Sequence, residues 1–401
     1  MSKKVLILGG GYAGIRTATA LKKKSGDFQV TLVDQHDYHT EKTCLHEVAT
    51  GQKRPEDICY NIPKCVNGSH SQFIQDTVVK IDKDAQVVEL KSGTKLEYDY
   101  LVMALGFESE SFGIAGVDEN AFSMVNLEEA KAIHRHILNE FELWQKDKDP
   151  KHLEIVICGA GFTGIELAGA FVEEIPKYAK KYGFSPADVK LQIVEASSHL
   201  LPMFPRTIAD YAIDYLKRKG CKFETGAKIN KIEPGVVHYV LDDVEKETTG
   251  NTIIWTTGVR GSHLVGESGF AEKRGRVIVK DDLTIEGYDN IFMIGDVAAA
   301  MNPENNMPYP TTAQIALAMS DTCADNILAK INGQPCKKFV YVSKGTVCSL
   351  GNTNAIGQVG KKCLKGYPAS ALKKIIATRA IHMGSRSIGT MFSKGRFDLY
   401  R

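Results

Sequence analysis

The sequence has no long apolar run and no paired cysteine motif. No window of its 401 residues approaches the ~18 to 20 consecutive apolar side chains of a membrane-spanning helix, so any contact with a membrane is expected to be peripheral. The nine cysteines are an odd number and form no C-x-x-C pair, which indicates reduced thiols in a cytosolic protein. The first apolar stretch, Val5 to Leu8, is too short for a signal peptide and predicts a β-strand instead.

An excess of one charge is also lacking over the whole chain. Lys and Arg total 50 against 48 Asp and Glu, which is ordinary for a soluble enzyme and excludes a nucleic-acid-binding composition. The charge is unevenly placed, however, because the last 41 residues carry +9 and the first 360 carry −7. A basic tail of this kind indicates a partner of its own.

The chain is long enough for two or three domains that each bury a core, since 43% of its residues are hydrophobic. A small disulfide-stapled protein and a disordered protein are therefore excluded. More than one folding unit is expected.

A strand, a glycine-rich turn and a helix follow one another at the N-terminus. Gly9, Gly11 and Gly14 come directly after Val5 to Leu8, and residues 15–24 have helical spacing. The first glycine permits a tight turn, the second lets the backbone approach a pyrophosphate, and the third lets helix and strand pack closely. The phosphate would lie at the positive end of the helix.

An acidic residue completes this first unit. A second strand, residues 29–33, ends in Asp34, which stands 20 residues after Gly14 and is placed to accept hydrogen bonds from a ribose. The two strands, the helix and the acid together predict a dinucleotide site. The alternative is a glycine-rich turn in an ordinary α/β protein.

The same unit occurs a second time. Gly159, Gly161 and Gly164 follow the apolar strand of residues 154–158, and residues 165–175 have helical spacing. The interval to the next strand is longer here, so we expect residues 176–188 to form a loop or a short helix.

The second unit also ends in an acid, Glu195, after a strand at residues 189–194. A carboxylate at this position would bind a free 2′-hydroxyl and repel a 2′-phosphate, so NADH is preferred over NADPH. Arg206 lies further along the chain and weakens that preference slightly. Two dinucleotide units in one chain indicate one permanent and one exchangeable dinucleotide, namely FAD and a nicotinamide.

A late strand decides which unit holds which dinucleotide. Residues 290–294 are apolar and lead into Gly295 and Asp296. From here the chain resembles the two-dinucleotide flavoprotein reductases, in which such an Asp bonds the flavin ribityl chain and the N-terminal unit holds the FAD adenosine. Gly106 and Gly258, each at the end of an apolar strand, fall where that superfamily carries the crossovers between its domains.

The segment after Asp296 indicates the branch of this superfamily. The run from Pro308 to Ala316 resembles the quinone-side motif of the type II NADH dehydrogenases, the single-subunit NADH:quinone oxidoreductases. Residues 159–166 and 345–351 resemble that family too. The family's second Gln is replaced by Ala318, so Gln314 would face the quinone with one hydrogen-bond partner missing, which affects quinone affinity or selectivity rather than the fold. The alternative for Gln314 is a polar residue at a helix start that faces solvent.

The resemblance implies a full set of site residues. Glu166 would approach the nicotinamide and the flavin, where it positions NADH or serves a proton path to the quinone pocket; its simpler role is a favourable acid in the first turn of a helix. Lys373 matches a family position near the quinone pocket. The residues that act on the substrates are then Glu166, Gln314 and Lys373. The residues that bind FAD and NADH are Gly9, Gly11, Tyr12, Ala13, Gly14, Asp34, Cys44, Gly106, Gly159, Gly161, Gly164, Glu195, Gly258, Asp296 and Ala313.

Three other functions stay open. A soluble FAD-dependent NADH oxidase or peroxidase would cycle the lone Cys44 through a sulfenic acid, although Cys44 can equally be a packing residue beside the flavin. A sulfide:quinone reductase would need flanking cysteines and no NADH, and a sensor or scaffold would bind both nucleotides without turnover. His36, His39 and His46 lack metal-ligand spacing, so no metal is expected and they are interpreted as loop or flavin-proximal residues.

The C-terminal tail has the composition of a membrane anchor. In residues 369–383, Leu372, Ile375, Ile376 and Met383 fall on one helical side, with Lys373, Lys374 and Arg379 on the rest of the surface. Such a helix can lie in an anionic lipid interface, and Ile388 to Phe397 could form a second anchor. The alternative is a basic but solvated helix.

The predicted fold class is therefore α/β, with two Rossmann-like domains of the glutathione-reductase type and a C-terminal membrane-docking segment. The predicted domains are a split FAD domain at 1–113 and 286–330, an NADH domain at 114–285, and a C-terminal domain at 331–401. The predicted function is a NADH:quinone oxidoreductase that does not pump protons and reduces a membrane quinone, menaquinone. It would be a homodimer held peripherally at the cytoplasmic face of the cell membrane.

Overall fold

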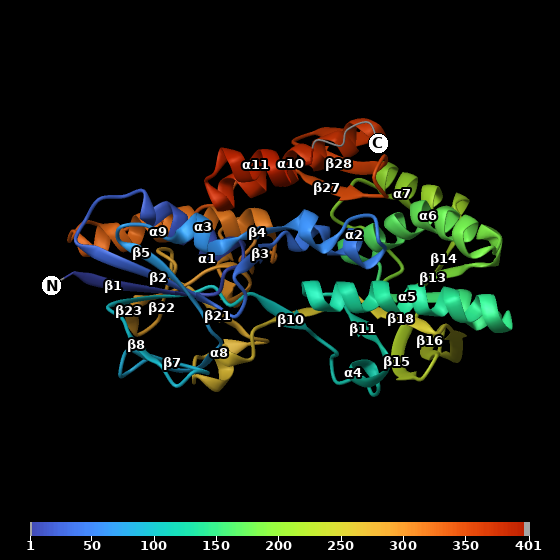
Figure 1. Ribbon diagram of the computed structural model, residues 1–401, viewed down its shortest axis with the longest axis horizontal. Helices are drawn as coiled ribbons and strands as arrows, with labels where there is room; N and C mark the ends of the chain where they lie inside the picture. The colour runs from blue at the N-terminus through green and yellow to red at the C-terminus, as the bar shows by residue number, and fades with distance from the viewer. Residues whose placement is uncertain (1, 397–401) are drawn as a thin grey trace.

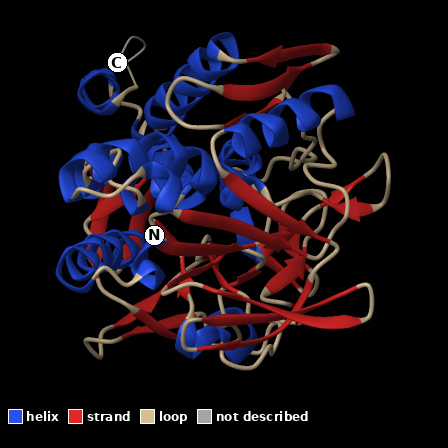
Figure 2. Ribbon diagram, turned by 90° about the vertical axis from the view of Figure 1, so that its right-hand side faces the viewer, coloured by secondary structure: helices blue, strands red, loops and turns tan. Residues whose placement is uncertain are grey.

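A computed structural model describes residues 2–396 of the chain. Two sheet-containing domains lie side by side, and the C-terminal helices and strands cross over both along one edge (Figure 1). Strands form the centre of the molecule and helices flank them, as Figure 2 shows. The predicted α/β class with two Rossmann-like domains is confirmed by this arrangement.

The first domain is built on a six-stranded sheet with the order β22-β23-β9-β1-β2-β5. All its strands are parallel except β22, which pairs antiparallel with β23. The strands are β1 (Lys3–Leu8), β2 (Phe28–Asp34), β5 (Ser71–Gln75), β9 (Tyr100–Met103), β22 (Thr284–Ile285) and β23 (Tyr288–Met293). The helices of this domain are α1 (Tyr12–Lys22), α3 (Ile62–Val66), α8 (Leu264–Glu267) and α9 (Ala313–Ile331). The short helix α2 (Leu45–Ala49) lies between β2 and β5 in the chain, but its apolar side chains pack in the core of the second domain.

The second domain has a five-stranded parallel sheet with the order β11-β18-β12-β13-β14. Its strands are β11 (Phe122–Ser123), β12 (Glu154–Cys158), β13 (Lys190–Glu195), β14 (Cys221–Thr225) and β18 (Thr252–Trp255). Its helices are α4 (Val117–Asn120), α5 (Leu127–Asp147), α6 (Phe162–Tyr182) and α7 (Arg206–Arg218). Strand β12 lies in the middle of this sheet and is buried on both faces, which explains its unbroken apolar run.

Each domain also carries a three-stranded antiparallel sheet, so the internal repeat extends beyond the glycine motifs. These are β6 (Val78–Asp82), β7 (Val87–Leu90) and β8 (Lys95–Glu97) in the first domain, and β15 (Lys228–Glu233), β16 (Val236–Leu241) and β17 (Val244–Thr249) in the second. The chain crosses between the domains on β10 (Phe107–Ser109) and returns on β19 (Val259–Gly261), and these two strands pair with each other.

The return into the first domain comes earlier than the predicted residue 286. Leu264, Phe270 and Val277 already pack in the same core as β1 and β9. The apolar pattern between β19 and β22 is short and broken by glycines, so the sequence alone did not indicate which core it joins.

The loop or short helix predicted at residues 176–188 does not begin at Pro176, although a short 3-10 helix does form at Pro186–Asp188. Helix α6 continues through Pro176 to Tyr182 and ends at Gly183, which has the left-handed φ of +79° that favours glycine. A proline lacks the N–H of one helical hydrogen bond. Burial of Ala179 and Tyr182 in the core of the second domain offsets that loss.

The C-terminal segment forms an antiparallel sheet and two helices. The elements are β27 (Thr346–Ser349), β28 (Ala355–Val359), β29 (Lys362–Lys365), α10 (Tyr367–Ser385) and α11 (Ile388–Lys394). Helix α10 lies on α1 of the first domain, where Thr19 Oγ1 donates to the carbonyl of Gly384 at 2.9 Å and Arg16 donates to that of Met383 at 2.7 Å. The tail is thus part of the folded body.

The predicted faces of α10 need correction. Lys374 is buried and Lys373 points toward the second domain, so neither supplies surface charge, whereas Ile375 is 58% exposed. Apolar and basic residues are interspersed along α10, so its sequence pattern does not mark one buried face. The buried face is the one that packs on α1, and the sequence does not reveal that contact. The predicted second anchor ends at Phe397, which lies outside the described residues. Over residues 2–396, no helix has both the length and the apolar character needed to cross a membrane.

Candidate active site

The first glycine loop has the geometry expected of a phosphate site. Gly9 joins β1 to α1 with φ +102°, and a Cβ on Gly14 would overlap the carbonyl oxygen of Gly9. A Cβ on Gly11 would meet no atom within 4 Å, so open space lies in front of the first turn of α1. Tyr12 and Ala13 belong to that turn, and their N–H groups precede the first helical hydrogen bond, which Ile15 donates to Gly11. This space fits the diphosphate of FAD.

Asp34 already bonds the loop that it follows. Its Oδ2 accepts from the N–H of Gly10 at 2.5 Å and its Oδ1 accepts from His36 at 2.8 Å. These two bonds hold the Asp34 carboxylate in place. Its oxygens have further lone pairs, so it can still accept hydrogen bonds from ribose hydroxyls.

The second glycine loop repeats this arrangement. Gly159 has φ +107°, a Cβ on Gly161 would meet no atom within 4 Å, and a Cβ on Gly164 would overlap the carbonyl of Gly159. Glu195 accepts from the N–H of Ala160 and from that of Ser197, each at 2.7 Å. The residues present therefore fit a second dinucleotide.

The two crossover glycines lie where the chain passes between domains. Gly106 has φ +74°, and its carbonyl accepts from the N–H of Ser262 at 3.2 Å. Gly258 directly precedes β19, and a Cβ there would lie 2.5 Å from the ring of Phe112. Gly106 thus has a backbone conformation that favours glycine, and Gly258 lies at a close approach.

Asp296 follows β23 in the short 3-10 helix Gly295–Val297. Burial raises the pKa of Asp296 above its usual value, although Lys42 and Arg276 act to lower it. Beside it, Thr312 caps α9 by accepting from the N–H of Ile315, and Ala313 is the first residue of that helix.

A buried charged cluster joins the two domains and the C-terminal segment. Glu166, in the first turns of α6, lies 2.7 Å from Lys373 of α10 through its Oε1. The N–H and hydroxyl of Ser349 each donate to the same oxygen at 3.0 Å. His46 of α2 places its Nδ1 3.8 Å from Oε2 of Glu166. Predicted residues Glu166 and Lys373, 207 positions apart, thus form a direct ion pair.

The charges of this cluster are mutually stabilised. Burial acts to raise the pKa of Glu166, but the attraction of Lys373 and His46 and the hydrogen bonds from Lys373 and Ser349 outweigh it, so that pKa lies below its ordinary value. Burial likewise opposes the charge of Lys373, yet the pairing with Glu166 raises its pKa. Burial lowers the pKa of His46 despite the nearby acids. An ionised Glu166 and a protonated Lys373 follow.

Gln314 is bonded within the protein rather than facing solvent. Its Oε1 accepts from the Tyr341 hydroxyl at 3.0 Å and its Nε2 donates to the carbonyl of Gly345 at 3.3 Å. The half-buried Ala318 lies one turn further along α9. The structure does not bring Gln314 into the ion pair of Glu166 and Lys373.

Cys44 is buried at the end of a short 3-10 helix before α2. Burial and the neighbouring Glu47 raise the pKa of its thiol to about 12, although Arg396, 3.8 Å away, acts to lower it. A thiol of this kind carries little thiolate at neutral pH, which favours the packing role over the sulfenic-acid cycle.

Sequence reasoning missed several members of this region. His46 was interpreted only as a loop or flavin-proximal residue, and Ser349 was quoted only as part of a family-like segment. The ion pair of Glu47 with Arg396, at 2.8 Å, was not expected, because 349 residues separate the two and neither stands in a motif. One signal for His46 and Glu47 was present in the sequence, since they stand side by side in the Leu-His-Glu run at the start of α2.

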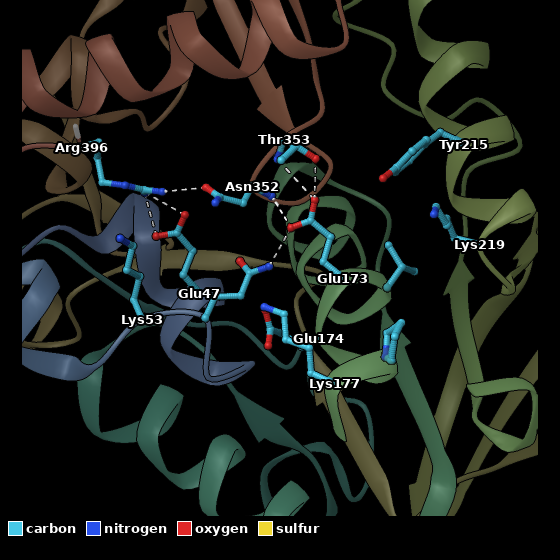
Figure 3. A pocket seen from close by; sticks show the side chains of 13 residues that line it. Glu47, Lys53, Glu173, Glu174, Lys177, Tyr215, Lys219, Asn352, Thr353 and Arg396 are labelled. Atoms are coloured by element: carbon cyan, nitrogen blue, oxygen red, sulfur yellow. Dashed lines mark hydrogen bonds and ion pairs between the residues drawn. The ribbon is translucent and has the colours of Figure 1, made fainter. Parts of the chain in front are cut away.

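A cavity of about 630 Å³ opens beside this cluster. Figure 3 shows Arg396 reaching Glu47 at one side and Glu173 turned toward Asn352 and Thr353. The cavity is bordered by the end of α2, by α6 and α7, and by the loop before β28. Polar and charged side chains dominate its wall, which suits water and small polar solutes.

Comparisons with known proteins agree with this geometry. Residues 3–320 match the family model described as pyridine nucleotide-disulphide oxidoreductase. The type II NADH:quinone oxidoreductase of Staphylococcus saprophyticus is 43% identical over 98% of this chain and 99% of its own length. The protein of the same name from Staphylococcus aureus is 42% identical over the same shares of the two chains.

Solved structures share the fold at lower identity. NDH2 from Plasmodium falciparum in complex with NADH has a TM-score of 0.86 at 18% identity and covers 98% of this chain and 97% of its own. The sulfide:quinone oxidoreductase of Aquifex aeolicus has a TM-score of 0.80 at 23% identity, covering 96% and 92%. The matches confirm the predicted enzyme class and the cofactor pair of FAD and NADH. The chain therefore belongs to the pyridine nucleotide-disulphide oxidoreductase family and, within it, to the type II NADH:quinone oxidoreductases.

Proposed function

We propose that this protein oxidises NADH through FAD and reduces a membrane quinone, menaquinone, without pumping protons. FAD, when bound, accepts a hydride from NADH and delivers two electrons to the quinone. The observation that carries the proposal is the Glu166–Lys373 pair, because it places a buried ion pair where the second domain, α2 and the C-terminal segment meet. The chain's contribution is alignment of the reacting groups rather than nucleophilic attack.

The second glycine loop is the proposed NADH site. The space at Gly161 and the first turn of α6 would hold the diphosphate, and Glu195 would accept from the ribose hydroxyls. Its negative charge would repel a 2′-phosphate. The first loop, with Asp34, Gly106 and Asp296, would hold FAD in the same way.

Glu166 is proposed to position the nicotinamide and to serve the proton path to the quinone. Three donors converge on its Oε1, so the carboxylate cannot turn, and its Oε2 remains directed toward His46. Lys373 stays protonated beside it and can hold or supply a proton at Nζ as the quinone is reduced.

Gln314 is the proposed quinone contact at the start of α9. Its amide would have to exchange its bond to Tyr341 or to Gly345 for one to the quinone. Since Ala318 offers no second amide, we expect weaker or less selective quinone binding than a second glutamine would give.

The surface of α10 and α11 is the proposed membrane contact. Ile375, Ile388 and Phe392 are 58%, 62% and 65% exposed, and the exposed Arg379 lies on the same helix as Ile375. Apolar residues beside a cation suit a peripheral contact with anionic lipid. A homodimer at the cytoplasmic face of the cell membrane completes the proposal and rests on the family resemblance.

An anaerobic redox titration tests the function. NADH should bleach the flavin of the purified holoenzyme, and a menaquinone analogue in detergent should reoxidise it at the rate of steady-state turnover. The Cys44→Ser variant should behave as the unmodified protein does, with Cys363→Ser, an exposed thiol, as its control. Reduced flavin that ignores quinone but reacts with peroxide only when Cys44 is present would overturn the proposal in favour of a peroxidase.

A further inference from the structure

The ammonium group of Lys42 lies near Gly106, one of the residues proposed to bind FAD. Lys42 opens the 3-10 helix Lys42–Cys44, and its Nζ lies 4.3 Å from the centroid of the Phe107 ring. The same Nζ is 3.9 Å from the point that a Cβ on Gly106 would occupy. Within residues 2–396, Lys42 forms no ion pair with a carboxylate of the protein. Lys42 therefore has a cation–π contact with Phe107 but no carboxylate partner among the described residues, which leaves its charge available to an anion.

The charges around Lys42 locate it along the site. Burial lowers its pKa, and four acids oppose that effect, in the order Asp296, Asp34, Glu129 and Glu108. Asp34 ends β2 beside the first glycine loop, and Asp296 follows β23. Both acids that border the proposed FAD site are thus among the charges that act on Lys42, and its Nζ lies near Gly106, a third residue proposed to bind FAD.

The negative charge of FAD is on its diphosphate, between the parts of the cofactor that Asp34 and Asp296 would bind. Along the molecule come the adenosine ribose, the diphosphate, the ribityl chain and the ring. Under the proposed function Asp34 takes the ribose and Asp296 takes the ribityl chain, so the diphosphate lies between them. The first turn of α1 supplies N–H donors to it but no net charge of its own, whereas an ammonium group adds the attraction of a full positive charge.

We propose that Lys42 is the counter-charge of the FAD diphosphate and thereby a determinant of cofactor retention. The inference rests on the proposed positions of the ribose and the ribityl chain, but not on quinone reduction. Its Nζ, held over Phe107, would bond a phosphate oxygen. Because this pair would be only partly buried, salt would still screen it in part, so retention of FAD should weaken as the ionic strength rises.

Binding of FAD to the apoprotein tests the proposal without NADH or quinone. Lys42→Gln should raise the dissociation constant of FAD by about 10-fold or more and flatten its dependence on salt, as loss of a charge-assisted bond predicts. ADP, which carries the diphosphate but no ring, should lose affinity by the same factor when it competes with FAD. Lys42→Arg should restore most of the affinity, and Lys64→Gln, an exposed lysine of α3, should change nothing.

Two results would overturn the proposal. The first is a FAD dissociation constant of Lys42→Gln within about twofold of that of Lys64→Gln. The second is weaker FAD binding with unchanged ADP competition, which would place the charge at the ring. Thermal unfolding of the two apoproteins at equal midpoints verifies that the substitution leaves the fold intact. A failure of quinone reduction would leave all of these measurements unaffected.

Discussion

Ionisation of Glu166 depends on the ammonium group of Lys373 and on Ser349. Lys373→Met removes the cation and leaves a buried carboxylate, which costs about 3 kcal/mol when one partner of such a pair is lost. Because the attraction of Lys373 keeps the pKa of Glu166 low, that pKa should rise in the variant. The acid limb of the turnover–pH profile should then move to higher pH.

The measurement is kcat and KM for NADH and for quinone across pH in the variant. Lys373→Arg should restore the profile, and Lys362→Met, an exposed lysine of β29, should leave it unchanged. An unshifted acid limb in Lys373→Met would show that Glu166 is held ionised by other groups.

A second titrating cluster lies far from the site. His152 contacts Glu140 at 2.8 Å and Asp147 at 3.1 Å. Burial acts to lower the pKa of His152, but its hydrogen bonds to both acids raise it above 6.5. A raised histidine pKa stabilises the fold fully below the unfolded value of about 6.5, and this stability is lost as the pH rises through the folded pKa.

Urea unfolding of the protein and of His152→Gln measures this contribution. As the pH rises from about 6 through the folded pKa of His152, the unmodified protein should lose more stability than the variant. His238→Gln, a more exposed histidine on β16, serves as the control. Parallel pH curves for the protein and His152→Gln would contradict the expectation.

At the scale of elements, α6 connects the second domain to the C-terminal sheet. A Cβ on Gly169 would lie 2.6 Å from the backbone of Leu350, just after β27. Gly169→Ala should therefore push α6 and β27 apart, displace Ser349 from Glu166, and destabilise the protein by about 1–3 kcal/mol. Gly389→Ala in α11, where the nearest side-chain atom is 3.8 Å away, should be neutral or slightly stabilising.

The melting temperature of the two variants measures the effect. Gly169→Ala should melt several degrees lower and turn over more slowly, and Gly389→Ala should do neither. Equal melting temperatures would mean that β27 can move away without cost.

The same elements show what sequence could and could not predict. Glycine spacing and apolar strands predicted both loops, Asp34 and Glu195, because these signals are local. The course of α6 past Pro176 was missed, because the tertiary burial of Ala179 and Tyr182 outweighs a local helix-breaking signal. The inward side of α10 and the pairing of Glu47 with Arg396 depend on surfaces formed by distant segments, which no local pattern encodes.

At the scale of the whole molecule, the apolar side chains of α10 and α11 should set where the enzyme resides. Ile388→Ser combined with Phe392→Ser removes two exposed apolar groups and should weaken binding to anionic vesicles by about 10-fold or more. Arg379→Gln should weaken it less and reduce its salt dependence.

Vesicle flotation with anionic and neutral lipids measures this binding. Val244→Ser, an exposed apolar residue on β17 of the second domain, is the matched control. Turnover with a water-soluble quinone analogue should be unchanged in the double variant. Equal flotation of all variants would assign the membrane contact to another surface.

The placement of α10 across both domains has a consequence for synthesis on the ribosome. The sheet of the first domain cannot be completed before β23 is synthesised, and β23 follows the whole second domain in the chain. Helix α10 comes later still, and it bonds Glu166 on the second domain and packs on α1 of the first. While the second domain is being translated, the FAD site of the nascent chain is incomplete, because β23 has not yet been synthesised. Cofactor loading is therefore expected to be a late event, and translation arrest before residue 293 should leave a chain that cannot retain FAD.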